Sequence, residues 1–203
     1  MFAYGVEQSF HPEVGMFRFS QSLACCAAAL CMMSGVAMAE KIKNPEYEMW
    51  AKFKVGAMAK IEGKTIAAGQ ESKQVIVNKL LELSADKAVV ETTVEMEMMG
   101  QKMAMPPQKR DVPAEVEKVN IDPKNGPAPT AESKTSEETI TAAGKSFDCK
   151  VTETTFEQAG SKSVAKMWAC PDVPGGMVKT EAKTTGSMES TSTMTLIEFS
   201  TGG

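Results

Sequence analysis

Two segments in the middle of the chain alternate between apolar and polar residues, and this period of two constrains the fold more than any other feature. The first segment runs from Lys73 to Leu83 and the second from Ala88 to Met99. Successive side chains of a strand point to opposite faces of a sheet, so each segment is predicted to be a half-buried β-strand. The residues of one parity are Val75, Val77, Lys79, Leu81 and Leu83 in the first segment, and Val90, Thr92, Val94, Met96 and Met98 in the second. The turn-forming residues 84–87 predict that the two strands pair antiparallel.

Shorter runs of the same kind predict further strands before and after this pair. Residues 55–62 lead into an expected turn at Gly63 and Lys64, and residues 65–68 begin the return. Later strands are expected at 138–141, 146–157, 162–169, 177–184 and 187–199. Connections this short favour an antiparallel meander.

Two segments depart from the strand pattern. Residues 45–54 carry Tyr47, Trp50 and Phe53 at three-residue spacing, which predicts a short helix or an extended entry whose aromatic rings close the end of a sheet. Residues 106–135 contain six prolines. Proline removes a ladder donor and fixes φ, so we expect a long surface connection there.

The first 39 residues are expected to be a signal peptide. Arg18 precedes an apolar run that begins at Leu23, and the small-residue motif Ala37-Met38-Ala39 precedes the charged Glu40. This order is typical of an export signal that is cut after Ala39. Residues 1–15 lack a basic start, so Met16 is an alternative initiator. A retained membrane anchor and a lipid-modified cysteine remain alternatives, because the apolar run approaches spanning length and contains Cys25, Cys26 and Cys31.

Removal of the leader leaves one domain, residues 40–203, with Cys149 and Cys170 as its only cysteines. Two cysteines in an oxidising compartment usually pair. A hairpin with Ala159-Gly160 at its tip would place Val151 opposite Trp168 and Cys149 opposite Cys170. Directly opposed residues of this kind approach within disulfide range, so the register predicts a bond between these two cysteines.

Composition excludes several functions. The only histidine, His11, belongs to the leader, which argues against histidine-dependent catalysis and against most zinc sites in the domain. The formal net charge is −4 and the lysines are scattered among acids, so nucleic acid is not an expected partner. No second apolar segment approaches spanning length. We therefore expect a protein that is not an enzyme and needs no cofactor.

A cluster of methionines is the most unusual local feature. Its members are Met96, Met98, Met99, Met103 and Met105. Thioether sulfur is a soft ligand for Cu(I), so these residues are candidate metal ligands. Methionine also fills irregular apolar gaps, so packing is the simpler explanation. A third interpretation is a surface for an apolar ligand, for which the candidate residues are Trp50, Phe53, Met96, Met98 and Trp168.

The segment from Trp168 to Lys179, in which a strand ends in an aromatic residue before a Pro/Gly bend and a new strand, resembles a feature of the LolA-like superfamily. Residues 83–90 look similar to the upstream hairpins of that family. The resemblance implies a single curved antiparallel sheet, a half-barrel that holds a helix or a lipid-like ligand in its concave face. The fold class expected is thus mainly β, with a short N-terminal helix and the Pro-rich connection.

The function expected from these features is that of an exported binding or carrier protein for an apolar small molecule or a lipidated partner. Its expected location is the periplasm or the exterior. The alternatives are a methionine-based Cu(I)-binding protein and a purely structural envelope protein.

Overall fold

A computed structural model describes residues 40–98, 100–118, 130–158, 160–186 and 189–203. The expected leader, and with it the alternatives for its processing, lies outside these residues. The described chain forms one helix and two antiparallel sheets. The large sheet contains β2 (Met58–Ala67), β3 (Gln70–Leu83), β4 (Lys87–Met98), β5 (Gln101–Pro113), β7 (Thr130–Ala142), β8 (Lys145–Gln158), β9 (Ser161–Ala169), β10 (Met177–Thr185) and β11 (Ser190–Ser200). The remaining elements are β1 (Lys41–Lys43), α1 (Pro45–Trp50) and β6 (Glu115–Glu117).

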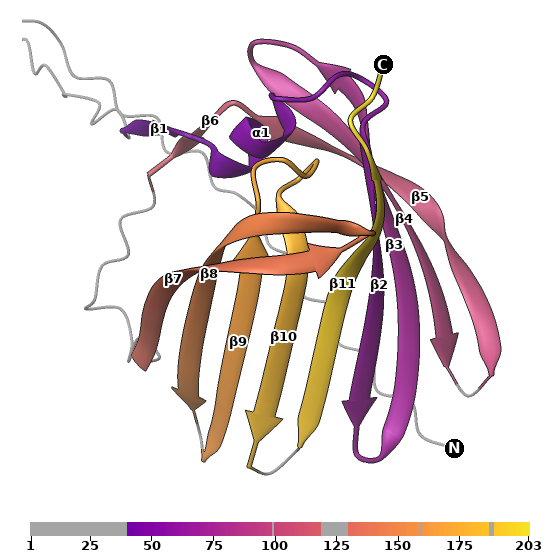
Figure 1. Cartoon of the computed structure of the whole chain (residues 1–203), viewed down its shortest axis with the longest axis vertical. Coiled ribbons are helices and arrows are strands. Elements are labelled where there is room, and N and C mark those ends of the chain that lie inside the picture. Colours follow the sequence, from indigo (N-terminus) through magenta and orange to yellow (C-terminus); the bar gives the residue numbers. More distant parts are fainter. Residues whose placement is uncertain (1–39, 99, 119–129, 159, 187–188) are drawn as a thin grey trace, which may run out of the picture. The chain divides into compact units, whose positions relative to one another are not determined.

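The strand order of the large sheet is β5-β4-β3-β2-β11-β10-β9-β8-β7 (Figure 1). Two series of consecutive hairpins, β2 to β5 and β7 to β11, are joined where β2 pairs with β11. The sheet is not closed, because β5 and β7 are its two edges. The expected fold class, a single antiparallel meander sheet with a short helix, is confirmed.

The expected turn at Gly63 and Lys64 is wrong, because both residues lie inside β2. The chain turns instead at Ala68 and Gly69, whose φ angles are 50° and 76°. Two positive φ values in a two-residue loop are what a tight hairpin needs. Gly63 has a different role within the strand: a Cβ atom there would lie 2.7 Å from the side chain of Gln74, its partner on β3.

The expected alternation in β3 is also interrupted. The pairing with β4 shifts between Leu80 and Glu82, which marks a β-bulge at Leu81. Leu80 precedes the bulge, shares the face of Ile76, and is fully buried. The sequence pattern predicted Leu81 for the apolar face together with Val75 and Val77, but these two valines pair with Glu95 and Thr93 on the other face of the sheet. The expected alternation of β4 agrees with the register.

The expected connection over residues 106–135 is shorter in the structure. Residues 106–113 belong to β5 and the chain re-enters the sheet at Thr130; residues 119–129 lie outside the described segments. Pro106 and Pro107 fall where two residues of β5 oppose Thr93 of β4. Prolines within a sheet are tolerated in edge strands and at bulges. Pro106 and Pro107 lie in an edge strand and also at a bulge.

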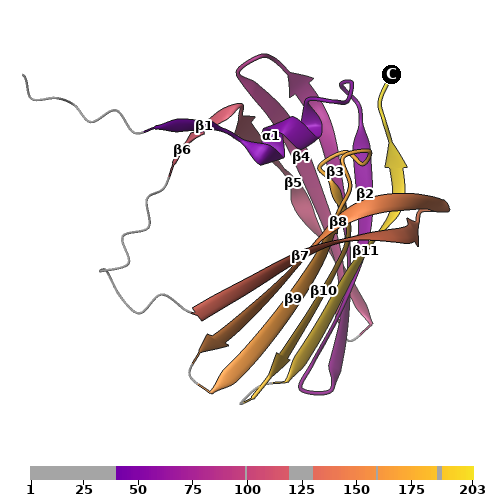
Figure 2. The same cartoon turned by 60° about the vertical axis from the view of Figure 1, so that its left-hand side comes forward.

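The β8–β9 hairpin has the predicted register. Val151 pairs with Trp168, Glu153 with Lys166 and Glu157 with Lys162. The pairing ends at Lys150 and Ala169, one step before the two cysteines. Figure 2 shows the other end of β8 turning across the neighbouring strands, where Phe147 packs edge-to-face against Phe199 of β11 with ring centroids 5.6 Å apart.

Apolar residues are buried in two clusters. The helix cluster consists of Trp50, Ala57, Leu80, Ala88, Val90 and Val112. The hairpin cluster consists of Ala59, Ile61, Ala142, Phe147, Cys149, Val151, Trp168, Cys170, Val173, Val178 and Leu196. The expectation that aromatic residues of the N-terminal segment close one end of the sheet is confirmed, since Tyr47 and Phe53 pack beside the helix cluster.

Helix α1 is held in place by its ends. The Asn44 side chain accepts a hydrogen bond from the Glu46 N–H, and Pro45 occupies the first turn, where its missing donor is harmless. The Tyr47 hydroxyl donates to the Ser84 carbonyl at 2.6 Å. Gly175, in the bend between β9 and β10, allows close approach to Trp50, because a Cβ atom there would lie 2.9 Å from the indole ring.

Candidate functional site

One row of side chains crosses seven strands on a single face of the large sheet. Met103 of β5 lies opposite Met96 of β4, which lies opposite Gln74 of β3. The row continues through Gly63, Met194, Thr180 and Met167. Directly paired residues share a face, so methionines from four different strands lie on the same side of the sheet.

The adjacent rows extend this surface, which we call the methionine face. It comprises Ile61, Gly63, Thr65, Ser72, Gln74, Ile76, Val94, Met96, Met98, Gln101, Met103, Met105, Ala165, Met167, Thr180, Ala182, Ser192, Met194 and Leu196. None of these side chains is charged. Along the strands the face changes from aliphatic residues to methionines and then to small hydroxyl and amide residues.

The opposite face of the same strands is charged. It carries Glu62, Lys64, Lys73, Glu95, Glu97, Lys102, Lys166, Lys179 and Glu181. Short ion pairs join Lys64 to Glu71 and Lys179 to Glu181, each at 2.7 Å. The hydrogen bond from Lys64 lowers the pKa of Glu71. The single-residue alternation of the strands therefore separates two chemically different surfaces.

Several residues of the methionine face remain exposed. The exposed fractions are 42% for Met98, 52% for Met103 and 45% for Met105, and Met167 on β9 is 43% exposed. Ile61 and Leu196, one row away, are almost fully buried. The exposed methionines therefore do not fill the core of the described chain. Met99 lies outside the described residues.

Helix α1 covers one end of this face. Val90 and Met96 share a face of β4, and Val90 packs in the helix cluster with Trp50. At the other end, hydroxyl groups pair across strands: Thr65 lies 3.1 Å from Ser192, and Ser163 lies 2.9 Å from Thr184. Toward α1 the face thus continues through Asn78 and Thr92 to the helix cluster and to Arg110, the partner of Val90, which forms an ion pair with Glu46 of α1. Hydroxyl groups border the other end.

The structure does not bring all five candidate ligand residues together. Met96 and Met98 lie on the methionine face. Trp50, the last residue of α1, is only 2% exposed, and Phe53 packs beside the helix cluster. Trp168 faces the other way, where its ring lies 4.6 Å from the Lys166 ammonium and 5.1 Å from the Lys179 ammonium.

Glu138 of β7 organises the surroundings of Trp168. Its carboxylate accepts hydrogen bonds from Lys166 Nζ at 2.7 Å and from Trp168 Nε1 at 2.8 Å. These two hydrogen bonds lower the pKa of Glu138, the one from Lys166 having the larger effect. The indole N–H is therefore satisfied, and the cluster joins β7 to β9.

Cys149 and Cys170 are buried, unbonded thiols in the structure. Burial, followed by the neighbouring Cys170, raises the pKa of the Cys149 thiol to about 11. The thiolate is the reactive form of cysteine, so this side chain is a poor nucleophile in the folded chain. The disulfide stays a prediction.

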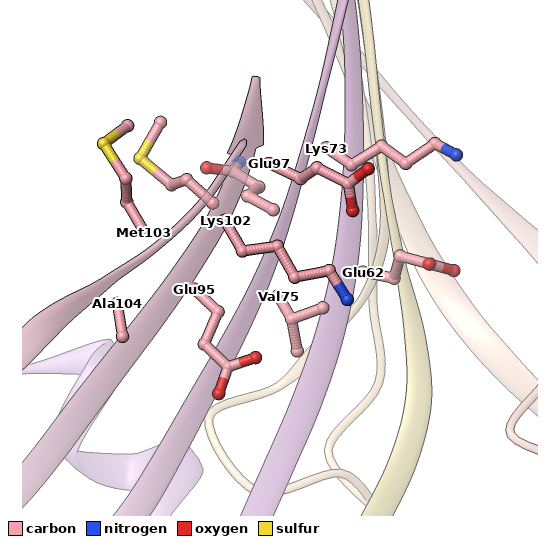
Figure 3. Close-up of a pocket in the computed structure, with 10 residues that line it drawn as sticks. Glu62, Lys73, Val75, Glu95, Glu97, Lys102, Met103 and Ala104 are labelled. Carbon is pink, nitrogen blue, oxygen red and sulfur yellow. The ribbon is translucent and has the colours of Figure 1, made fainter. Parts of the chain in front are cut away.

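A hollow of about 470 Å³ lies over β2 to β5. Figure 3 shows Lys102, Glu95 and Glu62 around it, with Met103 pointing away from them. Its lining contains three glutamates and two lysines, so the charges offset one another only in part. Within the described segments, no group of three or more His, Cys, Asp or Glu side chains could hold a metal ion. No described helix is long and apolar enough to cross a bilayer.

Sequence reasoning missed Met167 and Met194 as parts of the same surface. They come from β9 and β11. These strands join β2 to β5 in one sheet only because β11, the last strand in the sequence, pairs with β2. The sequence contains no local signal for that pairing.

Comparison with protein-family models and with curated protein sequences finds no match. Among solved structures, the chain is similar to a "putative lipoprotein" of Parabacteroides distasonis, with 12% identity, a TM-score of 0.44, and coverage of 75% of this chain and 98% of that one. It is also similar to a "putative exported protein with YmcC-like fold" of Bacteroides fragilis, with 12% identity, a TM-score of 0.41, and coverage of 74% and 99%.

A third similar structure is a "putative outer membrane lipoprotein-sorting protein domain" of Vibrio parahaemolyticus. The identity is 13%, the TM-score is 0.26, and 75% of this chain and 88% of that chain are covered.

Proposed function

We propose that this protein is an exported, non-enzymatic carrier that binds the acyl chains of a lipid or of a lipidated partner against the methionine face. The observation that carries the proposal is the absence of charge on that face, together with the exposure of Met98, Met103 and Met105. A charged or strongly polar ligand would find no ion-pairing partner there. An acyl chain would remove apolar surface from water on both sides of the contact.

The magnitude of this effect suits reversible binding. Burial of one exposed methionine side chain contributes roughly 1.5–3 kcal/mol at most, and these residues are only half exposed. Methionine is unbranched and polarizable, so a methionine surface adapts to chains of different shape. Several such contacts, less the cost of ordering the ligand, favour a carrier that can also release its cargo.

The ends of the face suggest the orientation of the ligand. At one end the helix cluster lies under α1, whose last residue is Trp50. At the other end Thr65, Ser192 and Thr184 provide hydroxyl groups. Hydroxyl groups can donate and accept hydrogen bonds. A polar head group would lie at the hydroxyl end, and the acyl chain would extend toward α1.

The test uses the mature protein, purified from its own envelope and examined by native mass spectrometry with lipid analysis of the extract. We expect a bound lipid in the wild type and at least a tenfold loss of it in Met103→Glu. Ala104→Glu is the matched control, because it adds the same charge one residue away on the opposite face.

Equal lipid loss in the two variants would contradict the proposed surface. A wild-type protein that carries no lipid, and takes none from vesicles, would contradict the carrier function and leave a structural envelope role.

A further inference from the structure

Four thioethers lie within a small part of the methionine face, at the end of the β4–β5 hairpin. Met96 and Met103 are direct cross-strand partners. Met98 lies two residues nearer the turn on β4 and is diagonal to Met103, whereas Met105 lies two residues farther from the turn on β5 and is diagonal to Met96. Direct partners in an antiparallel pair have Cβ atoms about 4.5–5.5 Å apart, and diagonal neighbours are about 7–8 Å apart. Three rotatable bonds in each side chain allow the sulfur atoms to converge.

We propose that Met96, Met98 and Met103 bind one Cu(I) ion through their thioether sulfurs. Met105 lies on the other side of the Met96–Met103 pair, about 14 Å along the strands from Met98, and is not part of this ligand set. Soft thioether ligands select Cu(I) over harder divalent ions. The carboxylates that would bind harder cations, those of Glu95 and Glu97, lie on the opposite face. The ligand set is therefore uniformly soft and neutral.

The exposure of these residues favours a ligand role over packing. Met98 and Met103 are 42% and 52% exposed, so their sulfur atoms are not required by the core. Met194 lies on the same face of β11, three strands from Met96. With about 4.8 Å between strands, Met194 is about 14 Å away and belongs to no common coordination sphere. Met167 on β9 is two strands farther away than Met194, so it cannot share a metal ion with Met96 either.

Binding at this site changes no oxidation state and releases no proton, since a thioether carries none. The affinity is therefore expected to be constant between about pH 6 and pH 8. A site formed by the thiols of Cys149 and Cys170 would behave differently, because each thiol must lose a proton to bind a metal. The raised pKa of Cys149 keeps that thiol protonated over this pH range, so metal binding there would release a proton and weaken as the pH falls.

The experiment uses the mature protein with its methionine methyl groups labelled with ¹³C, titrated with Ag(I) as a redox-inert analogue of Cu(I). We expect one ion per chain, with methyl shifts at Met96, Met98 and Met103 and none at Met167 or Met194. Competition with a Cu(I) chelator at pH 6 and pH 8 then gives the affinity.

The variant is Met96→Leu/Met98→Leu/Met103→Leu, and the matched control is Met167→Leu/Met194→Leu. Leucine preserves volume and apolar character, so folding is expected to be retained in both variants, as unchanged unfolding curves would show. We expect at least tenfold weaker metal binding in the first variant and no change in the second. Unchanged binding in the first variant, shifts spread over all methionines, or a strong pH dependence would each overturn the proposal.

A metal-binding result and a lipid-binding result can be told apart. Loss of Ag(I) binding in the leucine variant, with an unfolding curve like that of the wild type, supports the metal site independently of the carrier function. The Met103→Glu and Ala104→Glu pair tests the carrier function without metal.

Discussion

The two apolar clusters stabilise the same sheet in different ways. The helix cluster is centred on one large side chain, Trp50, which the N-terminal segment places over β3, β4 and β5. The hairpin cluster is larger and is built mostly from medium-sized residues of β2 and of β7 to β11. The first cluster should therefore depend on a single residue, whereas the second distributes its stability over many contacts and a pair of cysteines.

The segment that carries Trp50 is attached to the sheet by polar contacts. The Asn44 side chain donates to the Pro113 carbonyl at 2.8 Å, Arg110 pairs with Glu46, and Lys41 to Lys43 form a short ladder with β6. These contacts are exposed, and exposed ion pairs contribute little. The position of α1 therefore depends chiefly on the burial of Trp50.

The largest expected effect is that of Trp50→Ala. Truncation of a buried tryptophan should lower the free energy of unfolding by about 3–5 kcal/mol, measured by denaturant titration. Trp50→Phe is the control. The Trp50 Nε1 atom has no hydrogen-bond partner among the described residues, so phenylalanine removes an unsatisfied donor and should destabilise much less. An equal loss in both variants would contradict the account of this cluster.

The second prediction compares Leu80→Ala with Leu81→Ala. Leu80 is fully buried in the helix cluster and its truncation should cost about 2–5 kcal/mol. Leu81 lies at the bulge and is partly exposed, so its truncation should cost less than about half as much. Thermal or chemical unfolding of the two variants measures the difference. The reverse order would show that the β3 bulge lies elsewhere.

The third prediction concerns the hairpin cluster. We predict that Cys149 and Cys170 are bonded in the exported protein, closing a loop of about 20 residues and contributing about 3 kcal/mol. Because the folded thiols are buried and the pKa of Cys149 is raised, the bond should form before folding is complete. The measurement is alkylation of unreduced, denatured mature protein followed by mass spectrometry. Two modified cysteines per chain would contradict the prediction.

The smallest expected effect is that of Glu138→Gln. The pKa of Glu138 is lowered in the folded state, so its stabilising effect is complete above the unfolded pKa of about 4.3 and is lost as the pH falls through the folded value. We expect a slightly lower melting temperature than wild type at pH 7, and a difference that shrinks as the pH falls below the unfolded pKa. Glu137→Gln is the control, and an equal shift at pH 7 and at pH 3 would contradict the assignment.

The sequence was sufficient for features that depend on local pairing. The alternation of β4 and the charge pairs of the β8–β9 hairpin each specify a register, and the structure has both. Bulges could not be predicted in this way. The bulge leaves Leu81 without an opposing residue on β4 and brings Leu83 to the face of Leu80, and the sequence pattern on either side of it is compatible with an uninterrupted strand.

The candidate site shows the same limit. Met96 and Met103 are close in the sequence and were grouped there as one methionine cluster, whereas Met167 and Met194 join them only through the pairing of β2 with β11. That pairing joins segments more than 100 residues apart, and no local pattern specifies it. The aromatic candidates were assigned by residue type alone, and their environments in the fold differ.

The two prolines at the bulge of β5 have a consequence for how copies of this chain meet. Edge strands with free N–H groups invite pairing with other chains. Pro106 and Pro107 have no backbone N–H group to offer in the middle of β5. The bulge at the same place also bends the strand, so that its pairing groups are not regularly spaced. A second molecule would find no continuous template along β5, so crowded chains should resist assembling edge to edge into extended sheets.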